Sequence, residues 1–298
     1  MIEHTAVSVH ALSRKKSAIR WSIFVGILLM IVKTIFSVLT NSMSVAASAI
    51  DSLLDVFVSS VNYISLREAS KPADDCHAYG HGKIESLAGL FQSIFISLSG
   101  LFLIYESLRR LVEGVELERL GSAIYVMIFS TLVTFLLVKR LSQVASETQS
   151  IIVGTEKLHF LTDIYTNLGV IAALLLVKWS GLVFWDLLIA LLIAGYVLRQ
   201  SFGIMRNAID ELIDRALPAN VQDQIRNIIL SHDSRVKGIH NLRTRRIGDK
   251  KFIEFHVEID KNMSFENAHN LTEDLIEKVK ENFPNSDVNA HFDPQGGR

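Results

Sequence analysis

Cysteine and proline are scarce in this sequence, and its charge is almost balanced. The one cysteine among the 298 residues, Cys76, excludes an intrachain disulfide and any zinc site built from several thiolates. A formal net charge of -1 gives no indication of a nucleic-acid partner. The four prolines lie at positions 72, 218, 284 and 294, so nearly all of the chain before position 210 can form uninterrupted helix.

Apolar residues, in contrast, are abundant and clustered, and 49% of the chain is hydrophobic. A bilayer span needs about 20 mostly apolar residues, and six segments meet this requirement. They run roughly over residues 18–39, 43–66, 84–111, 120–140, 152–177 and 182–205. The sequence therefore predicts a membrane all-α fold, a six-helix transmembrane bundle in domain 1–210, followed by a cytoplasmic domain over 211–298.

The first apolar segment follows a basic stretch at residues 14–20, and no small-residue cleavage signature comes after it. We therefore expect a retained span and not a signal peptide. Lys33 interrupts this segment, and its ammonium could reach the membrane surface by snorkelling. Residues 40–42 form the whole connection to the second segment, which predicts a tight antiparallel hairpin.

Lysine and arginine residues in the loops set the orientation of the spans. Those that precede the first segment, lie between the second and third, or follow the fourth are Arg14, Lys15, Lys16, Arg20, Arg67, Lys71, Lys83, Lys139 and Arg140. An even number of spans places these groups and both termini on one side, which we assign to the cytoplasm. Arg109, Arg110 and Arg119 fall on the other side, where we expect neighbouring glutamates such as Glu106 to pair with them.

Beyond Pro218 the pattern changes to that of a small α/β domain. Residues 219–232 have the spacing of an amphipathic helix, and two strand-like runs follow at 236–247 and 251–260. Gly248-Asp249 between these runs is a strong hairpin signal. A second helix is expected after Ser264 as its N-cap, and a last strand at about 287–292. The order α-β-β-α-β predicts an open-faced sandwich of the metallochaperone-like kind.

Two pairs of ionisable side chains stand four residues apart inside the apolar segments: Asp51 with Asp55, and His159 with Asp163. Ionisable groups at bilayer depth cost roughly 2.5–3.5 kcal/mol each on insertion scales. A spacing of four places both members of a pair on one helix face. Two such faces turned toward each other would offer three carboxylates and one imidazole to a divalent cation, which predicts a metal transport site.

Further polar residues extend both faces into stripes. The stripe in the second segment consists of Ser44, Ser48, Asp51, Asp55, Ser59 and Asn62, and the stripe in the fifth consists of Thr155, His159, Thr162, Asp163 and Thr166. A helix that lines a water-filled path needs such a stripe, and a lipid-facing helix does not. The structural alternative is a polar cluster that joins helices by hydrogen bonds. The hydroxyl residues fit that alternative, but the four ionisable ligands do not.

The composition of the ligand set favours some metals over others. Imidazole suits Zn²⁺, Cu²⁺, Fe²⁺ and Ni²⁺, whereas all-oxygen sites suit Mg²⁺, Ca²⁺ and Mn²⁺. One histidine with three aspartates therefore favours Zn²⁺, with Cd²⁺, Fe²⁺ and Co²⁺ as competitors. Because these ligands bind metal only when deprotonated, protons and metal compete for the same atoms. This competition gives a physical basis for proton-driven antiport.

Two further groups of potential ligands lie outside the spans. The loop after the second segment contains Asp74, His77 and His81, with Cys76 among them as a fourth ligand or a bystander. A metal site and a chance cluster weigh equally in that loop. The C-terminal domain contains a larger set, spread over separate elements: His240, His256, His269, His291 and Asp293. A two-metal site there requires these elements to converge, and ordinary surface histidines are the alternative.

Together these motifs resemble those of the cation diffusion facilitator family. DSLLD and HFLTD carry the two pairs, YGHGK lies in the loop, and GIHNLRTR and FHVEID occur in the C-terminal strands. The resemblance extends over nearly the whole chain and is strongest to bacterial zinc–proton antiporters, also described as ferrous-iron efflux proteins. It implies a homodimer in the lipid of the bacterial inner membrane, with both termini in the cytoplasm.

The resemblance also implies roles for individual residues. Asp51, Asp55, His159 and Asp163 would bind the transported ion, and Asp74, His77 and His81 would form a loop site. The positions of His240, His256, His269, His291 and Asp293 correspond to a binuclear site that steadies the cytoplasmic dimer. Lys83 and Asp214 would form a charge interlock at the dimer interface. Phe292 and Cys76 depart from the family pattern; a polar residue in place of Phe292 can assist the binuclear site.

We therefore expect an exporter of cytoplasmic Zn²⁺, or of Fe²⁺ or Cd²⁺, that exchanges the ion for protons by alternating access and is not an enzyme. A membrane-embedded metal sensor would use the cytoplasmic histidines equally well, but it needs no polar route through the bilayer. An intramembrane hydrolase with paired aspartates or a metal-bound water is a third possibility. It is disfavoured because four protein ligands leave no open position on the metal.

Overall fold

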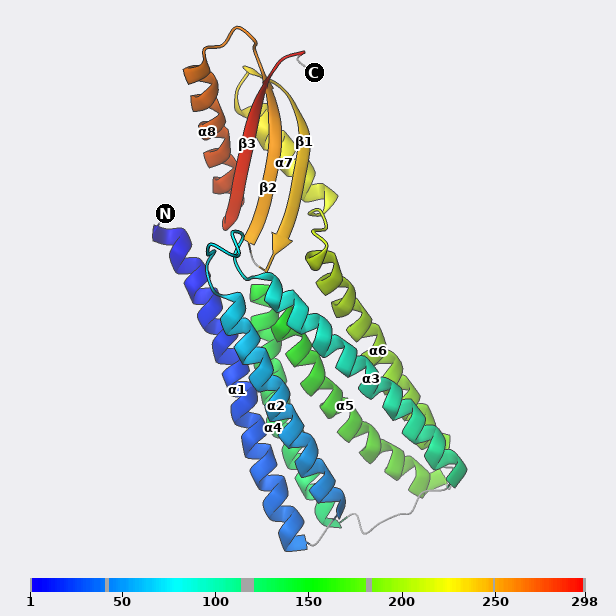
Figure 1. The fold of residues 1–298 in the computed structure, drawn as a ribbon. Coiled ribbons are helices and arrows are strands. Elements are labelled where there is room, and N and C mark those ends of the chain that lie inside the picture. The colour runs from blue at the N-terminus through cyan, green and yellow to red at the C-terminus, as the bar shows by residue number, and fades with distance from the viewer. Residues whose placement is uncertain (1, 41–42, 114–120, 181–183, 249, 297–298) are drawn as a thin grey trace. The chain divides into compact units, whose positions relative to one another are not determined.

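The computed structural model describes residues 2–40, 43–113, 121–180, 184–248 and 250–296. The chain divides into two compact units, one made of Ala11–Ile209 and the other containing Asp210–Arg298. The helices of the first part of the chain are α1 (Ile2–Thr40), α2 (Met43–Ala69), α3 (Lys83–Glu113), α4 (Gly121–Thr148), α5 (Ile151–Ser180) and α6 (Phe184–Leu212) (Figure 1). Each predicted apolar segment coincides with one of these helices as far as it is described.

Five of the helices contain a stretch that is long and apolar enough to cross a membrane. These stretches are Ala11–Leu39, Ser48–Ala69, Lys83–Glu106, Val126–Thr148 and Leu187–Leu212. Helix α5 is long enough to cross a membrane, at 30 residues. Its described residues, however, contain no stretch that meets the same criteria of length and apolar composition. The predicted connection at residues 41–42 lies outside the described residues. A helical membrane domain is thus confirmed, and the sixth span stays a prediction.

Apolar side chains on the outside of this unit suit a lipid environment. Phe24, Phe57, Phe95 and Leu136 are all exposed, between 57% and 69%. The interior contains a buried cluster that includes Ile19, Leu141, Ile152 and Phe160 and so joins α1, α4 and α5. An exposed apolar surface of this extent is typical of a membrane-embedded protein and not of a soluble monomer.

Helices α3 and α5 approach each other closely at Gly89. A Cβ atom at this position would lie 2.2 Å from Cγ2 of Ile151, so only glycine permits the observed contact. Close to this contact the structure has a buried ion pair, in which Lys15 Nζ lies 3.2 Å from Glu85 Oε2. Ser150 donates a hydrogen bond to the other oxygen of Glu85. Lys15, which we expected as a loop charge, therefore fastens α1 to α3 and to the start of α5.

Local pairing explains one of the basic residues that depart from the orientation rule. Arg109 donates to Glu106 at 3.3 Å, one turn earlier on α3, as predicted. The side chain of Arg110 and all of Arg119 lie outside the described residues. Pairing within one helix reduces the charge that Arg109 contributes to the orientation.

The C-terminal domain has the predicted order α-β-β-α-β. It consists of α7 (Ala219–His232), β1 (Val236–Ile247), β2 (Lys250–Ile259), α8 (Phe265–Asn282) and β3 (Ser286–Pro294). Strand β2 is central, antiparallel to β1 and parallel to β3. The Ser264 hydroxyl accepts a hydrogen bond from the Asn267 amide, which confirms the expected N-cap of α8.

Alternation along β2 separates the two faces of the sheet. Ile253, Phe255, Val257 and Ile259 are buried against α7 and α8, which cover the same face of the sheet. Helix α8 contributes the fully buried Leu275 to this core. Glu254, His256 and Glu258 occupy the opposite face, as the period of two requires. The register pairs His256 with His240 on β1 and with His291 on β3, so three histidines form one row across the sheet.

The core of this domain provides the first testable prediction. Leu275 is 0% exposed, whereas Leu230 on α7 is 46% exposed. Leu275→Ala should lower the free energy of opening of the β2 amides by about 2–5 kcal/mol, because it leaves a cavity in the core. Hydrogen exchange on the full-length protein in detergent measures this free energy. The matched substitution Leu230→Ala should change it by less than about 0.5 kcal/mol, and equal effects would contradict the described core.

Candidate metal centres

Helices α2 and α5 bring three of the four predicted transport ligands together. Asp55, His159 and Asp163 each present a ligand atom, and these atoms all lie within 4.8 Å of one another. Nε2 of His159 is 2.9 Å from Oδ1 of Asp55. All three side chains are half-buried. A carboxylate–imidazole–carboxylate group of this size matches the donor types that hold Zn²⁺ or Fe²⁺.

Asp51, the fourth predicted ligand, lies outside this group of three. It is one turn earlier than Asp55 on α2 and is more exposed than the other three. It lines the same cavity as Asp55, His159 and Asp163, a space of about 840 Å³. Asp51 can therefore reach an ion at the group only if its side chain or α2 moves.

The cavity also tests the predicted polar stripes. Ser48 and Asn62 of α2 and Thr162 and Thr166 of α5 line it together with the ionisable residues. Two stripe members do not line it: Ser59 donates to Glu156, and Thr155 donates to carbonyls of its own helix. The side chain of Ser44 is not among those described. Some stripe residues thus line the cavity, whereas Ser59 and Thr155 form hydrogen bonds away from it.

Lys33 does not extend toward the membrane surface, contrary to the snorkelling interpretation. Its ammonium donates to Ser52 Oγ at 2.8 Å and to the Ser48 carbonyl at 3.2 Å. Both acceptors are on α2 and flank Asp51 in the sequence. Lys33 also lines the cavity, so the charge lies beside the predicted transport ligands. Hydrogen-bond acceptors on a neighbouring helix stabilise a buried ammonium, so its side chain does not need to reach water.

Glu156 is a buried acid that the sequence reasoning did not single out. It is 0% exposed and accepts hydrogen bonds from Ser59 and Asn62 of α2. Gln92 of α3 donates to the same carboxylate at 3.4 Å, and Asn62 also donates to Gln92 at 3.0 Å. The available signal was its position three residues before His159, on the same face of α5. This network joins three helices one turn away from the ligand group.

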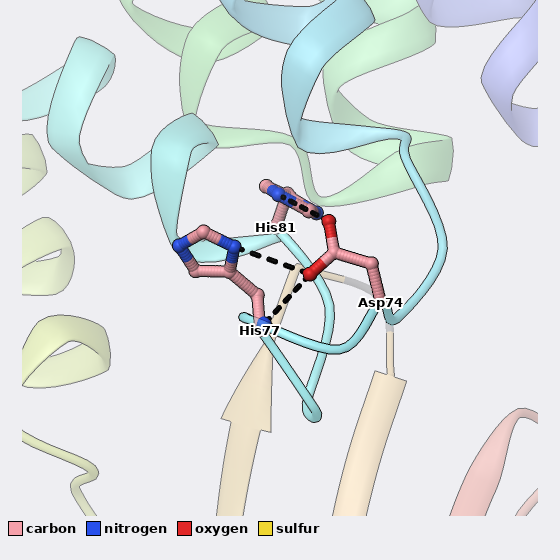
Figure 2. Close-up of side chains that lie close together, drawn as sticks. All are labelled: Asp74, His77 and His81. Carbon is pink, nitrogen blue, oxygen red and sulfur yellow. Dashed lines mark hydrogen bonds and ion pairs between the residues drawn. The ribbon is translucent and has the colours of Figure 1, made fainter.

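The loop ligands are close together in the structure, as Figure 2 shows. Nδ1 of His77 lies 3.3 Å from Oδ1 of Asp74, and Nε2 of His81 lies 3.5 Å from Oδ2 of Asp74. Backbone amides of His77 and Cys76 donate to Asp74 at 2.7 and 3.0 Å. These hydrogen bonds, that of His77 above all, hold the pKa of the Asp74 carboxyl below its ordinary value. Asp74 therefore stays an anion between the two rings.

Second contacts orient the loop further. Nδ1 of His81 lies 3.3 Å from the Pro72 carbonyl, an arrangement that leaves Nε2 for a metal, because ligating histidines commonly bond their other ring nitrogen to a carbonyl or carboxylate. Cys76 is an exposed free thiol. Its sulfur is not part of the ligand group formed by Asp74, His77 and His81, so the described geometry uses its backbone and not its thiol.

In the C-terminal domain one carboxylate collects three of the predicted histidines. Asp293 Oδ2 lies 2.8 Å from His256 Nδ1 and 3.1 Å from His240 Nε2, and its Oδ1 lies 3.3 Å from His291 Nε2. The hydrogen bond from His256 is the main cause that lowers the pKa of Asp293 below its ordinary value. His240 also lies 3.4 Å from Glu258. Strands β1, β2 and β3 thus converge on one possible metal position.

His269 is not brought into this group. It is exposed on α8, where its ring is parallel to that of Phe265 with centroids 6.5 Å apart. Phe265 in turn contacts Phe292 edge to face, with centroids 5.9 Å apart. Phe292 packs against the core between the sheet and its helices, so His269 and its aromatic neighbours lie apart from the group at Asp293. Within a single chain, four of the five expected ligands therefore lie together, and His269 does not join them.

Comparisons with known proteins identify the family of the chain. A family model described as the cation efflux transmembrane domain matches residues 19–213, and one described as the cation efflux protein, cytoplasmic domain, matches residues 217–295. The chain is 38% identical over 270 residues to the cation-efflux pump FieF of Pectobacterium carotovorum subsp. carotovorum (strain PC1), covering 91% of this chain and 89% of that protein. It is 36% identical over 280 residues to the pump of the same name from Shewanella oneidensis, covering 94% of each.

Among solved structures, the chain is similar to the metal-bound C-terminal domain of the CzcD transporter from Thermotoga maritima, with 31% sequence identity. The match covers 27% of this chain and 98% of the CzcD domain, with a TM-score of 0.25.

The loop group leads to a test with a neighbouring control. Asp74→Ala removes the carboxylate that both rings face, so the full-length protein should bind about one metal ion fewer per chain at saturating Zn²⁺. Elemental analysis of the protein after equilibrium dialysis measures this number. Asp75→Ala removes a neighbouring exposed carboxylate that is not in the group, and it should leave the number unchanged. An unchanged number in Asp74→Ala would mean that the loop group is a chance cluster.

Proposed function

The chain belongs to the cation efflux family and is a multi-pass membrane transporter of metal cations, and from that premise we propose that it exports Zn²⁺ in exchange for protons. Fe²⁺ and Cd²⁺ are alternative cargoes, with Co²⁺ a further one. Transport proceeds by alternating access, without covalent chemistry. The observation that carries the proposal is the group of Asp55, His159 and Asp163 on two facing helices that line one cavity.

The choice of cargo rests on the donor atoms. An imidazole nitrogen and carboxylate oxygens favour borderline ions such as Zn²⁺ and Fe²⁺ over Mg²⁺ or Ca²⁺. Three ligands from the described group, with Asp51 as the fourth once its side chain or α2 moves, would complete a tetrahedral ion. The transported ion therefore binds through two helices, and a relative displacement of these helices changes its coordination.

Proton coupling follows from the same atoms. His159 must be neutral and the aspartates must be ionised to bind a metal, so a proton that arrives at any of them competes with the ion. His159 contacts Asp55 directly at 2.9 Å, and protonation of the imidazole therefore disturbs both ligands. A higher proton concentration outside then favours release on that side, and a lower one inside favours loading.

The two other groups are proposed as cytoplasmic metal sites. Asp74, His77 and His81 would bind an ion in the loop before α3, and His240, His256, His291 and Asp293 would hold metal on the open face of the C-terminal sheet. His269 would join only through a change in α8 or through a second chain. The protein is proposed to be a homodimer with its second family domain as the dimerisation unit.

The charge interlock between Lys83 and Asp214 belongs to the proposed dimer. Lys83 is the first residue of α3, and Asp214 follows α6. Asp214 has a positive φ of 58° and accepts a hydrogen bond from Arg245 at 3.2 Å. A carboxylate already held by Arg245 can accept a second cation on its other lone pairs. Six spans with both termini in the cytoplasm of a bacterium, at the inner membrane, complete the proposed arrangement.

Transport assays test this function directly. The protein is reconstituted in vesicles that contain a zinc-sensitive dye and have an acidic lumen, and zinc is added outside. Zinc should accumulate, and the rate should fall when an ionophore removes the pH gradient. His159→Ala and Asp51→Ala should each lower the initial rate at least tenfold, because an ion that loses one ligand binds and moves poorly.

Ser60→Ala provides the control on the same helix. Its hydroxyl donates to the Val56 carbonyl of α2, and it does not line the cavity, so the flux should stay within twofold of the parent. Parent-like flux in both ligand variants would refute the site. Zinc binding without any flux in the parent would indicate a membrane-embedded sensor instead.

A further inference from the structure

The cavity contains an ammonium group that none of the metal-binding roles uses. Five of the described residues that line it are ionisable: Lys33, Asp51, Asp55, His159 and Asp163. Lys33 comes from α1, whereas the ligand group comes from α2 and α5. Among these described cavity residues Lys33 is the one lysine or arginine. Its position therefore has a direct effect on the field at the ligand group.

Contacts hold this ammonium on the helix that carries two of the acids. It donates to Ser52 Oγ at 2.8 Å and to the Ser48 carbonyl at 3.2 Å. Ser52 is 1% exposed and directly follows Asp51. The ammonium is thus fixed by neutral acceptors near the carboxylates, and its position does not depend on the presence of an ion.

The charges of these groups balance in the loaded state. A dication and one ammonium together neutralise three carboxylates, while His159 binds metal as a neutral imidazole. Charge left over at bilayer depth is costly, so a loaded cavity with no excess charge is the one that can change access easily. Glu156 does not enter this balance because it lies outside the cavity lining and has its own donors.

We infer that Lys33 is a fixed counter-charge that makes the cavity neutral with one divalent ion, and that it thereby limits how tightly the ion is held. The inference rests on the proposed function, because it assigns a specificity-determining role at that transport site. Without the ammonium, a loaded cavity would keep one uncompensated negative charge. The dication would then bind more tightly, because its attraction to the carboxylates is no longer offset by repulsion from Lys33. Release would be slower for the same reason.

Two variants separate the charge of Lys33 from its hydrogen bond. Lys33→Gln removes the charge but keeps a donor for Ser52, and Lys33→Arg keeps the charge. Zinc flux into the vesicles is measured at pH 8 outside, where proton competition is weakest, over a range of zinc concentrations. In Lys33→Gln the half-saturating zinc concentration should fall at least tenfold and the maximal rate should also fall. Lys33→Arg should stay within threefold of the parent in half-saturation.

Lys157 provides a matched control for a lysine in the membrane unit. It lies on α5 and does not line the cavity, so Lys157→Gln should leave the half-saturating concentration unchanged. If Lys33→Gln assembles poorly, Lys33→Met is the second uncharged variant, and competition with a zinc dye on solubilised protein gives its affinity. A role in packing alone would lower the maximal rate and leave half-saturation unchanged or raise it.

An unchanged or higher half-saturating zinc concentration in the uncharged variants would overturn the inference. A tenfold fall of this concentration in Lys33→Arg would overturn it too. These outcomes are distinct from failure of the proposed function. In that case the parent itself would show no zinc flux, or His159→Ala would not reduce it.

Discussion

The membrane unit depends on one constraint: every ionisable group within its spans needs a partner that compensates the lost hydration. The structure meets this need in three ways. Lys15 and Glu85 form a buried ion pair, and Glu156 is surrounded by neutral hydroxyl and amide donors. Asp55, His159 and Asp163 compensate one another only partly and face a cavity. The third arrangement is the one in which we propose a cation as the missing partner, and this distinguishes it from the two structural groups.

The two complete arrangements explain how the incomplete one keeps its geometry. The pair of Lys15 and Glu85 joins α1 to α3, and Glu85 also accepts from Ser150 at the start of α5. Glu156 joins α5 to α2 and α3. Removing one partner of such a buried group costs more than the interaction itself contributes, because the other partner is left unpaired. The Glu156 network therefore fixes the spacing of α2 and α5, on which the contact between Asp55 and His159 depends.

Local patterns were enough to predict the elements and three residues that α2 and α5 bring together, Asp55, His159 and Asp163. Apolar runs located the helices, alternation located β2, and the spacing of four placed His159 and Asp163 on one face of α5. What sequence reasoning missed depends on tertiary packing. Acceptors on another helix determine the direction of the Lys33 side chain. The position of α8 separates His269 from the histidines of the sheet. Glu156 went unnoticed because no i, i+4 partner marked it, although an acid within an apolar helix was itself a signal.

In the proposed alternating-access cycle, the position of the Glu156 network restricts how α2 can move against α5. Ser59 and Asn62 follow Asp55 on α2, and Glu156 precedes His159 on α5, so the network lies about one helical turn from the ligand group. A movement that separates Asp55 from His159 therefore has two options. It can pivot near Glu156 and keep these hydrogen bonds, or it must break them and leave a carboxylate unsatisfied in a membrane helix. The second option costs several kcal/mol, so a small tilt of α2 against α5 about this network is the cheaper path.

A tilt of that kind moves Asp51 more than Asp55, because Asp51 is farther from the pivot. In the proposed cycle Asp51 would then join the ion in one state and leave it in the other.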